Sequence, residues 1–126
     1  MHRSRLYGLF MDTPEGEAAA ASTFWASALG GAVEPIPEEP EFTRIAGVFP
    51  GLAVDVQAVH DTARYHVDIE TDDVDAETAR LLSLGAELST DHGGHKILRA
   101  PGGHLLCVVP VQSSGDLFAT EAKTWP

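Results

Sequence analysis

Histidine and carboxylate side chains alternate along one short segment of the chain. His66, Asp68 and Glu70 occupy every second position of residues 65–71, with Val67 and Ile69 between them. Strict alternation predicts a β-strand that presents these two sets on opposite faces. A histidine among carboxylates could act as a general acid, a general base or an anchor near neutral pH, because the negative charges favour its imidazolium form. The alternative is a polar face that only meets water.

A second candidate face lies near the start of the chain. Arg5 and Tyr7 share one side of a predicted first strand with Leu9 and Met11. A guanidinium beside a phenol could hold an anionic or planar ligand. The alternative is that Arg5 belongs to a frayed terminus and binds nothing.

Three further side chains complete the candidate set. Asp55 and Gln57 share one face of a later strand, where they either line a cavity or meet solvent. Cys107 lies in a strongly apolar strand, which favours an inert buried thiol over a nucleophile. His92 and His95 flank a Gly-Gly pair, a pattern more typical of a flexible turn than of a metal site.

Composition limits the classes of partner. The chain has 126 residues, 44% hydrophobic, and its 8 Lys+Arg against 19 Asp+Glu give a formal net charge of −11. This excess of negative charge argues against nucleic acid and anionic membranes as partners. No segment has the roughly 18 apolar residues of a membrane-spanning helix, so we expect a cytoplasmic protein. One cysteine excludes an internal disulfide framework, and any metal site would need histidine and carboxylate ligands.

The predicted elements repeat in the same order. A first strand, a helix and three strands are expected at residues 6–11, 15–29, 32–36, 42–45 and 52–59. The order begins again with a strand at 65–71, a helix opened by Asp72 and Asp73, and strands at 86–89, 95–99 and 105–109. We therefore expect one domain over residues 1–126, with unit one at about 5–60, unit two at about 64–111 and a C-terminal tail at 112–126. Leu117, Phe118 and Trp125 could dock this tail on the body or on a second copy.

Both helices carry start signals and apolar stripes. Thr13 and Pro14 are expected to begin the first helix, and Gly30 to end it. Its predicted buried stripe consists of Ala21, Phe24, Trp25, Ala28 and Leu29. The second helix has its stripe at Val74, Thr78, Leu81 and Leu82.

The repeated order carries a family resemblance, together with residues 64–76, Leu84-Gly85-Ala86 and Ala100-Pro101-Gly102-Gly103-His104. The chain resembles the vicinal oxygen chelate superfamily, and within it the glyoxalase-like and bleomycin-resistance-like proteins. The resemblance covers about residues 6–111. It implies an α+β fold of two tandem βαβββ units that form a curved, cup-shaped mixed sheet with helices on the outer face. It also implies a homodimer, since family members often complete their cavities across chains.

In this superfamily a divalent metal, where present, lies at the bottom of the cup. His66, seven residues before Asp73, matches the histidine of the second unit. Arg5, seven residues before Asp12, stands at the corresponding place in the first unit and cannot ligate a cation.

The remaining two ligand positions are also altered. Cys107 replaces the carboxylate expected in the last strand, and the first-unit equivalent is Gln57, or Asp55 if the register slips by two. The resemblance therefore implies either no cofactor or an incomplete site at His66 and Gln57 for a divalent metal such as Zn, Ni, Mn or Fe. A softer Zn²⁺ could use His66 with Cys107.

The expected function is a glyoxalase-like or bleomycin-resistance-like protein that holds a small organic molecule in the cup. His66 would be the general acid or base, oriented by Asp68 or Glu70. The candidate lining comprises Arg5, Tyr7, Asp55, Gln57, Asp68 and Cys107. One alternative is a metal-dependent lyase, isomerase or dioxygenase of the same superfamily. Another is a non-catalytic protein that sequesters a drug, for which an acidic cup would suit a cationic ligand.

Overall fold

The computed structural model describes all residues, Met1–Pro126, and confirms the α+β class and the repeated element order. The strands are β1 (His2–Pro14), β2 (Ala32–Pro35), β3 (Phe42–Ala46), β4 (Ala53–Val59), β5 (Arg64–Thr71), β6 (Glu87–Asp91), β7 (Lys96–Arg99), β8 (Leu105–Pro110) and β9 (Lys123–Trp125). The helices are α1 (Ala18–Leu29), α2 (Val74–Ser83) and α3 (Gly115–Glu121). A 3₁₀ turn, Glu15–Glu17, precedes α1. Each of β1 and β5 thus begins a βαβββ series.

The strands form a mixed sheet, as expected. Their order is β2-β3-β4-β1-β5-β8-β7-β6, and β9 pairs with β1. The β1–β4 and β5–β8 pairs are parallel, whereas β2–β3, β3–β4, β6–β7 and β7–β8 are antiparallel. The edge position of β2 agrees with Pro35, whose nitrogen cannot donate to a neighbouring strand.

The chain packs into two compact units. We call Gly8–His66 the N-terminal unit, and Met1–Tyr7 together with Val67–Pro126 the C-terminal unit. The chain passes from one to the other within β1 and again within β5, so each of these strands contributes to both units.

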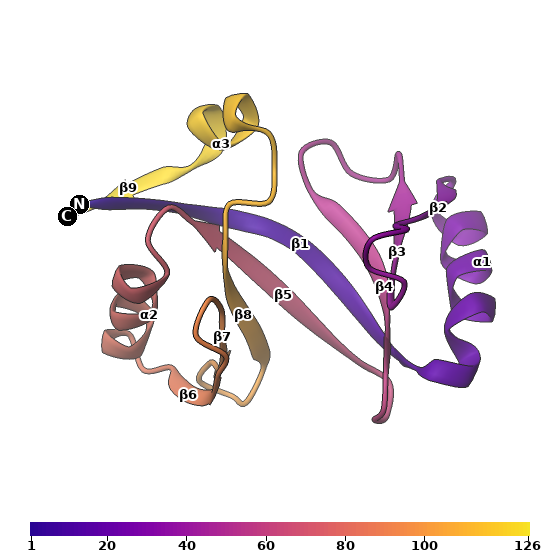
Figure 1. The fold of residues 1–126 in the computed structure, drawn as a ribbon, viewed down its shortest axis with the longest axis horizontal. Coiled ribbons are helices and arrows are strands. Elements are labelled where there is room, and N and C mark those ends of the chain that lie inside the picture. The colour runs from indigo at the N-terminus through magenta and orange to yellow at the C-terminus, as the bar shows by residue number, and fades with distance from the viewer. The chain divides into compact units, whose positions relative to one another are not determined.

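In the N-terminal unit, α1 covers one face of the strands (Figure 1). The core beneath it consists of Met11, Ala26, Ile45, Val54 and Val56. Ala18, Ala21, Trp25 and Val48 pack against this core.

The expected stripe of α1 is partly wrong. Ala21 and Trp25 face the core as predicted, but Phe24 is 61% exposed and Leu29 is 45% exposed. Ser22 and Ala26 are buried instead. These small side chains let the helix backbone approach the strands closely, so the buried face is set by fit as well as by hydrophobicity.

The start of α1 also differs from the prediction, whereas its end agrees. Thr13 does not cap the helix, because its hydroxyl donates to the carbonyl of Met11 at 3.0 Å. At the other end Gly30 adopts a left-handed φ of 72°. Only glycine takes this conformation readily, which explains why the helix ends there.

In the C-terminal unit, α2 packs over a core of Leu98, Leu106 and Val108. Val67, Ile69, Val74, Leu81, Ala86 and Ala100 complete it. The predicted helix start is confirmed, since the Asp73 side chain accepts a hydrogen bond from the backbone of Ala76. Leu82, expected in the stripe, is 40% exposed.

The predicted face of β1 is divided between the two units, because Arg5 and Tyr7 belong to one and Leu9 and Met11 to the other. Leu9 and Met11 were expected to share a mixed face with Arg5 and Tyr7, but Met11 belongs to the core beneath α1. A strand of 13 residues that serves two units does not need one buried face throughout. Alternation therefore predicts each half of β1 separately.

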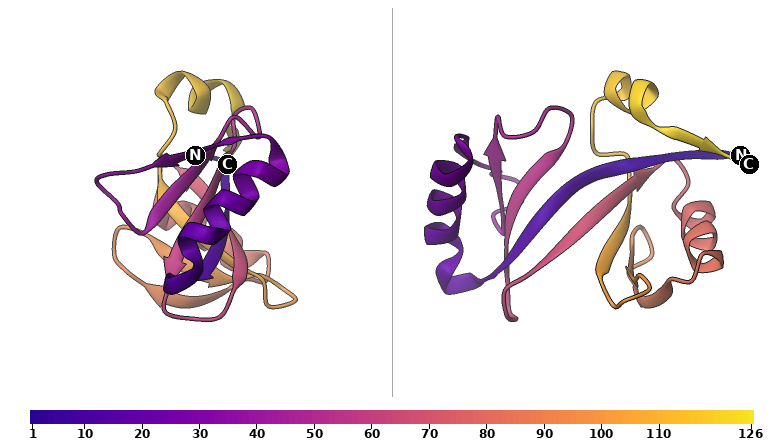
Figure 2. Two further views of the ribbon diagram at one scale, coloured as in Figure 1. Left: turned by 90° about the vertical axis from the view of Figure 1, so that its right-hand side faces the viewer. Right: turned by 180° about the vertical axis from the view of Figure 1, so that it is seen from behind.

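Both chain ends belong to the C-terminal unit and lie side by side (Figure 2). β9 pairs antiparallel with the start of β1, with His2 opposite Trp125 and Ser4 opposite Lys123. Phe118 of α3 is buried, which confirms that the tail docks on the body.

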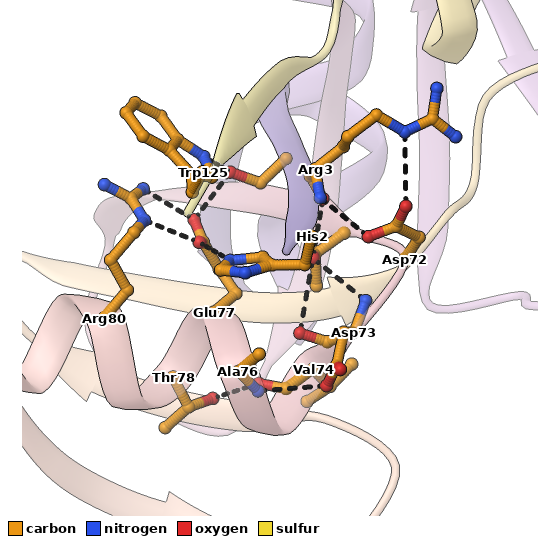
Figure 3. A network of polar contacts seen from close by, with 12 residues as sticks. His2, Arg3, Asp72, Asp73, Val74, Ala76, Glu77, Thr78, Arg80 and Trp125 are labelled. Carbon is orange, nitrogen blue, oxygen red and sulfur yellow. Dashed lines mark hydrogen bonds and ion pairs between the residues drawn. The ribbon is translucent and has the colours of Figure 1, made fainter.

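A buried carboxylate lies beneath these ends (Figure 3). Glu77 of α2 accepts hydrogen bonds from His2, Ser4 and Arg80, each at 2.7–2.8 Å. The Trp125 indole donates to the Ser4 hydroxyl at 2.8 Å, and the Arg80 guanidinium lies 3.8 Å from the centre of the indole ring.

Candidate functional site

The polar face of the N-terminal unit lies opposite the core beneath α1. Paired residues of neighbouring strands project to the same side of a sheet. Phe10 is opposite Asp55, and Asp12 is opposite Gln57, so these four side chains share a face. Because the apolar side chains of Met11, Val54 and Val56 occupy the other face, the polar side chains that could take part in binding or catalysis lie on this one.

His66 is fixed on this face by two contacts. Its Nδ1 lies 2.9 Å from Oδ2 of Asp12, and its ring stacks on Phe10 with 4.8 Å between ring centres and 8° between planes. A carboxylate only accepts hydrogen bonds, so Nδ1 donates to Asp12. The imidazole is thereby held in one orientation on this face.

Asp12 is itself held by a cation. Arg64 Nε donates to the same Oδ2 oxygen at 3.0 Å, and Arg64 Nη1 donates to Asp61 at 2.7 Å. The hydrogen bond to Asp12 is the main cause that raises the pKa of Arg64 above its ordinary value. The guanidinium therefore stays charged between the two carboxylates.

Aromatic and charged side chains lie beside Phe10 on the same face. Phe10 meets Phe42 edge to face, with ring centres 5.9 Å apart. Arg44 forms an ion pair with the buried carboxylate of Asp55. Asp55, predicted to bind a ligand, is thus a fixed counter-ion of Arg44, whereas Gln57 is partly exposed.

Glu70 and Arg5 form a buried ion pair in the C-terminal unit. Arg5 Nη1 lies 2.8 Å from Glu70 Oε2, and the carboxylate also accepts from the Ser113 hydroxyl and from the backbones of Gln112 and Ser113. Burial alone would raise the pKa of Glu70, but these hydrogen bonds outweigh it and lower the pKa below its ordinary value. Arg5 is therefore ordered rather than frayed, and Glu70 holds the start of the tail.

Three potential metal ligands lie on β5 and β8. Asp68 and Cys107 are register partners, and His66 precedes Asp68 by two residues on the same strand. Asp68 and Cys107 belong to the C-terminal unit, and His66 is the last residue of the N-terminal unit. An imidazole, a carboxylate and a thiolate are all ligands that Zn²⁺ accepts, and three protein ligands leave a position open. The donor set therefore fits a borderline-soft divalent metal.

The structure thus divides the predicted site residues into distinct groups. Asp55 and Gln57 lie on the polar face of the N-terminal unit, Arg5 pairs with Glu70, and Asp68 lies opposite Cys107. Tyr7 is half-buried on β1.

Sequence reasoning overlooked the partners that orient His66, which are Phe10, Asp12 and Arg64. Arg64 could have been found, because it lies two residues before His66 on β5 and alternation therefore puts both on one face. No local pattern could pair His66 with Asp12, because 54 residues separate them.

Comparison with known proteins identifies the family. A family profile described as a glyoxalase-like domain matches residues 8–109. The chain therefore belongs to the glyoxalase-like domain family, in agreement with the resemblance seen in the sequence. A search of curated protein sequences finds no match.

Solved structures share the fold at low identity. A hypothetical protein from Bacillus halodurans C-125 is 9% identical with a TM-score of 0.60, over 89% of this chain and 97% of that one. The chain is also similar to an NAD-dependent benzaldehyde dehydrogenase from Legionella pneumophila, with 13% identity, a TM-score of 0.60 and coverage of 83% and 98%. Methylmalonyl-CoA epimerase from Mycobacterium tuberculosis gives 16% identity, a TM-score of 0.52 and coverage of 85% and 88%. At these identities the likeness concerns the fold alone.

None of the helices is both long enough and apolar enough to span a membrane.

Proposed function

We propose that this glyoxalase-like protein binds a small organic molecule on its polar face and that His66 acts there as general acid or base. The observation that carries the proposal is the fixed imidazole, with Nδ1 on Asp12 and one ring face on Phe10. An acid–base side chain that is held in one orientation is what proton transfer to a bound molecule needs. Phe42, which is partly exposed beside Phe10, offers apolar contact, so an unsaturated or aromatic ligand suits the face.

A thermal-shift screen of small organic compounds against wild type and His66→Ala tests this proposal. Compounds that use the site should raise the Tm of the wild type and lose most of that effect in H66A. His60→Ala is a matched control in the same unit, because the His60 side chain is 89% exposed and pairs only with Glu15 at the surface. Equal shifts in wild type and H66A for every compound would refute the site.

The same compounds separate an enzyme from a sequestering protein. After incubation, a ligand recovered chemically altered by wild type but unaltered by H66A supports acid–base catalysis. A ligand bound stoichiometrically and recovered intact supports the bleomycin-resistance-like, drug-sequestering alternative, and the net charge of −11 would then favour cationic ligands.

A second candidate function is a metal-dependent lyase, isomerase or dioxygenase. The pairing of Asp68 with Cys107, and the position of His66 two residues before Asp68 on the same strand, favour it. When bound, a divalent metal would supply Lewis-acid chemistry at its open position. Asp12 would hold His66 so that Nε2 points away from the carboxylate, an arrangement that raises ligand basicity.

Metal content decides between the two candidates. Purified protein, before and after incubation with Zn²⁺, Mn²⁺, Ni²⁺ or Fe²⁺, should retain near-stoichiometric metal if the cluster is a site. H66A and Cys107→Ser should then lose it while His92→Ala retains it. No retention in the wild type would remove the metal-dependent candidate and leave the organic ligand alone on the face.

The proposal extends to the setting of the molecule. We place it in the cytoplasm as a homodimer, with residues 1–126 acting as one glyoxalase-like domain. Light scattering coupled to size exclusion tests the dimer, and an elution mass of one 13.4 kDa chain would contradict it.

A further inference from the structure

We infer that Gly8 is a positioning residue for His66 and acts through the ring of Phe10. This inference rests on the proposed role of His66, but it concerns what fixes the plane of that side chain. A Cβ atom placed on Gly8 would lie 3.2 Å from Cε1 of Phe10. The imidazole of His66 stacks on the same phenyl ring, with 4.8 Å between ring centres and 8° between planes. One ring thus lies against the site of the missing side chain and also supports the histidine.

The backbone conformation does not require glycine at position 8. Gly8 lies within β1 and is not among the glycines that have a positive φ. Other residues could therefore adopt its conformation, and most of them favour a strand more than glycine does. A glycine inside a strand often marks the close approach of another group. The absence of a side chain, rather than backbone freedom, therefore explains this glycine.

Two neighbours occupy the space that a side chain at position 8 would need. Ala53 of β4 is the register partner of Gly8, and the added Cβ would lie 2.9 Å from its carbonyl oxygen and 3.0 Å from its Cβ. These distances, like that to Phe10, are shorter than an ordinary van der Waals contact. Ala53 is held in the parallel β1–β4 ladder, whereas the Phe10 ring turns about single bonds. An added methyl group would therefore displace the ring more than the strand.

The Phe10 ring has little room to move without disturbing the stack. Phe10 is 3% exposed, and its ring meets Phe42 edge to face, with 5.9 Å between ring centres and 79° between planes. In a close-packed interior even one added methyl group is felt, because the neighbours relax only in part. Since the rings of Phe10 and His66 are nearly parallel, a tilt of the phenyl ring would separate them at one edge.

The stack and the hydrogen bond to Asp12 constrain His66 in different ways. The bond from Nδ1 to Asp12, at 2.9 Å, fixes the position of one atom of the imidazole. A single hydrogen bond of this kind leaves the ring able to turn about its axis. The flat contact with Phe10 removes that freedom. Gly8 therefore determines the plane of the imidazole, while Asp12 determines where its Nδ1 lies.

Nuclear Overhauser contacts between the ring protons of Phe10 and His66 test this inference in the ligand-free protein. We expect a strong contact in the wild type and a loss of most of its intensity in Gly8→Ala, because the effect falls steeply with distance. Gly16→Ala is the matched control in the same unit, since a Cβ at Gly16 would have nothing within 4 Å. A general loss of stability would lower the Tm of G8A but would not separate the two rings in the folded protein.

An unchanged ring contact in folded G8A, or an equal loss in Gly16→Ala, would overturn the inference. If G8A fails to fold, the double variant Gly8→Ala with Phe10→Leu decides, because leucine lacks the ring atom that the new methyl group meets. This double variant should be about as stable as Phe10→Leu alone. A double variant that is unfolded, or far less stable than Phe10→Leu, would place the clash at Ala53 and reject a role through Phe10.

A compound that raises the Tm of the wild type gives a second readout. Most of that rise should be lost in G8A and kept in Gly16→Ala. A full rise in G8A would remove the positioning role. If no compound binds, the proposed function fails, whereas the ring contact still decides whether Gly8 holds Phe10 against His66.

Discussion

At the scale of single residues, the site depends on contacts between segments far apart in the chain. His66 could be selected from the sequence because its strand alternates so regularly. Its partner, Asp12, lies on β1, and no pattern in the sequence pairs the two residues. Glu70 was expected to orient the histidine, but the structure surrounds it with Arg5 and the start of the tail. Alternation identifies which face a residue occupies, whereas the choice of partner depends on tertiary packing.

Glu70 makes a residue-scale prediction. Glu70→Ala should lower the free energy of unfolding by about 3–5 kcal/mol, because it strands the buried Arg5 guanidinium without its counter-ion. Urea denaturation followed by circular dichroism measures the change. Glu15→Ala is the control: its pair with His60 is exposed and should contribute no more than about 1 kcal/mol. A loss for E70A no larger than for E15A would contradict a structural role of the ion pair.

Glu70 and Glu77 also predict how stability depends on pH. Burial raises the pKa of each group, but hydrogen bonds from their partners outweigh it, so both pKa values lie below the ordinary 4.5. Their stabilising contribution is therefore present above about pH 4.5 and is lost as pH falls through the lowered folded-state values.

Urea midpoints measured from about pH 7 to about pH 3 should fall more steeply in wild type than in Glu77→Gln below pH 4.5. The variant is already less stable at neutral pH, so the two curves should converge under acid. Parallel curves would show that Glu77 binds protons equally in the folded and unfolded states.

At the scale of elements, the order and type of nearly every helix and strand could be predicted. Alternation located β5, and the Gly30 and Asp73 signals located one end of each long helix. The tail elements α3 and β9 could not be predicted, because their short segments have no period of their own and form by docking on β1 and the body. Hydrophobicity also misassigned Phe24, since small Ser22 and Ala26 allow closer helix packing than a large ring would.

The face of α1 is open to a paired substitution test. Ala26→Leu should destabilise the protein by about 1–3 kcal/mol, because added volume must enter a filled core beside Met11 and Val54. Phe24→Ser, on the exposed side, should change stability by less than about 1 kcal/mol, because it loses only an edge-to-face contact with Trp25. Thermal unfolding of the two variants measures both effects. A larger loss of stability for the Phe24 variant than for the Ala26 variant would contradict this face and support the stripe predicted from the sequence.

At the scale of the whole molecule, the excess of negative charge cannot be neutralised by ion pairs within the chain. Acidic residues outnumber Lys+Arg by 11, so even complete pairing of every cation would leave unpaired carboxylates. Their mutual repulsion is greater in the compact state than in the unfolded chain. Added salt screens this repulsion beyond about 8–10 Å at moderate ionic strength, while buried pairs such as Arg5–Glu70 are screened much less.

We therefore expect sodium chloride to stabilise the protein, with a rise in Tm of roughly 3–5 °C for each kcal/mol gained. Surface ion pairs act in the opposite direction, since salt weakens them, but their individual contributions are small. The double variant Glu38→Lys and Glu39→Lys reduces the net negative charge by four in an exposed turn and should lower the salt dependence. Calorimetry at low and high salt compares the two proteins. A Tm that falls with salt in wild type would mean that the ion pairs, rather than the excess of carboxylates, dominate the electrostatic free energy of folding.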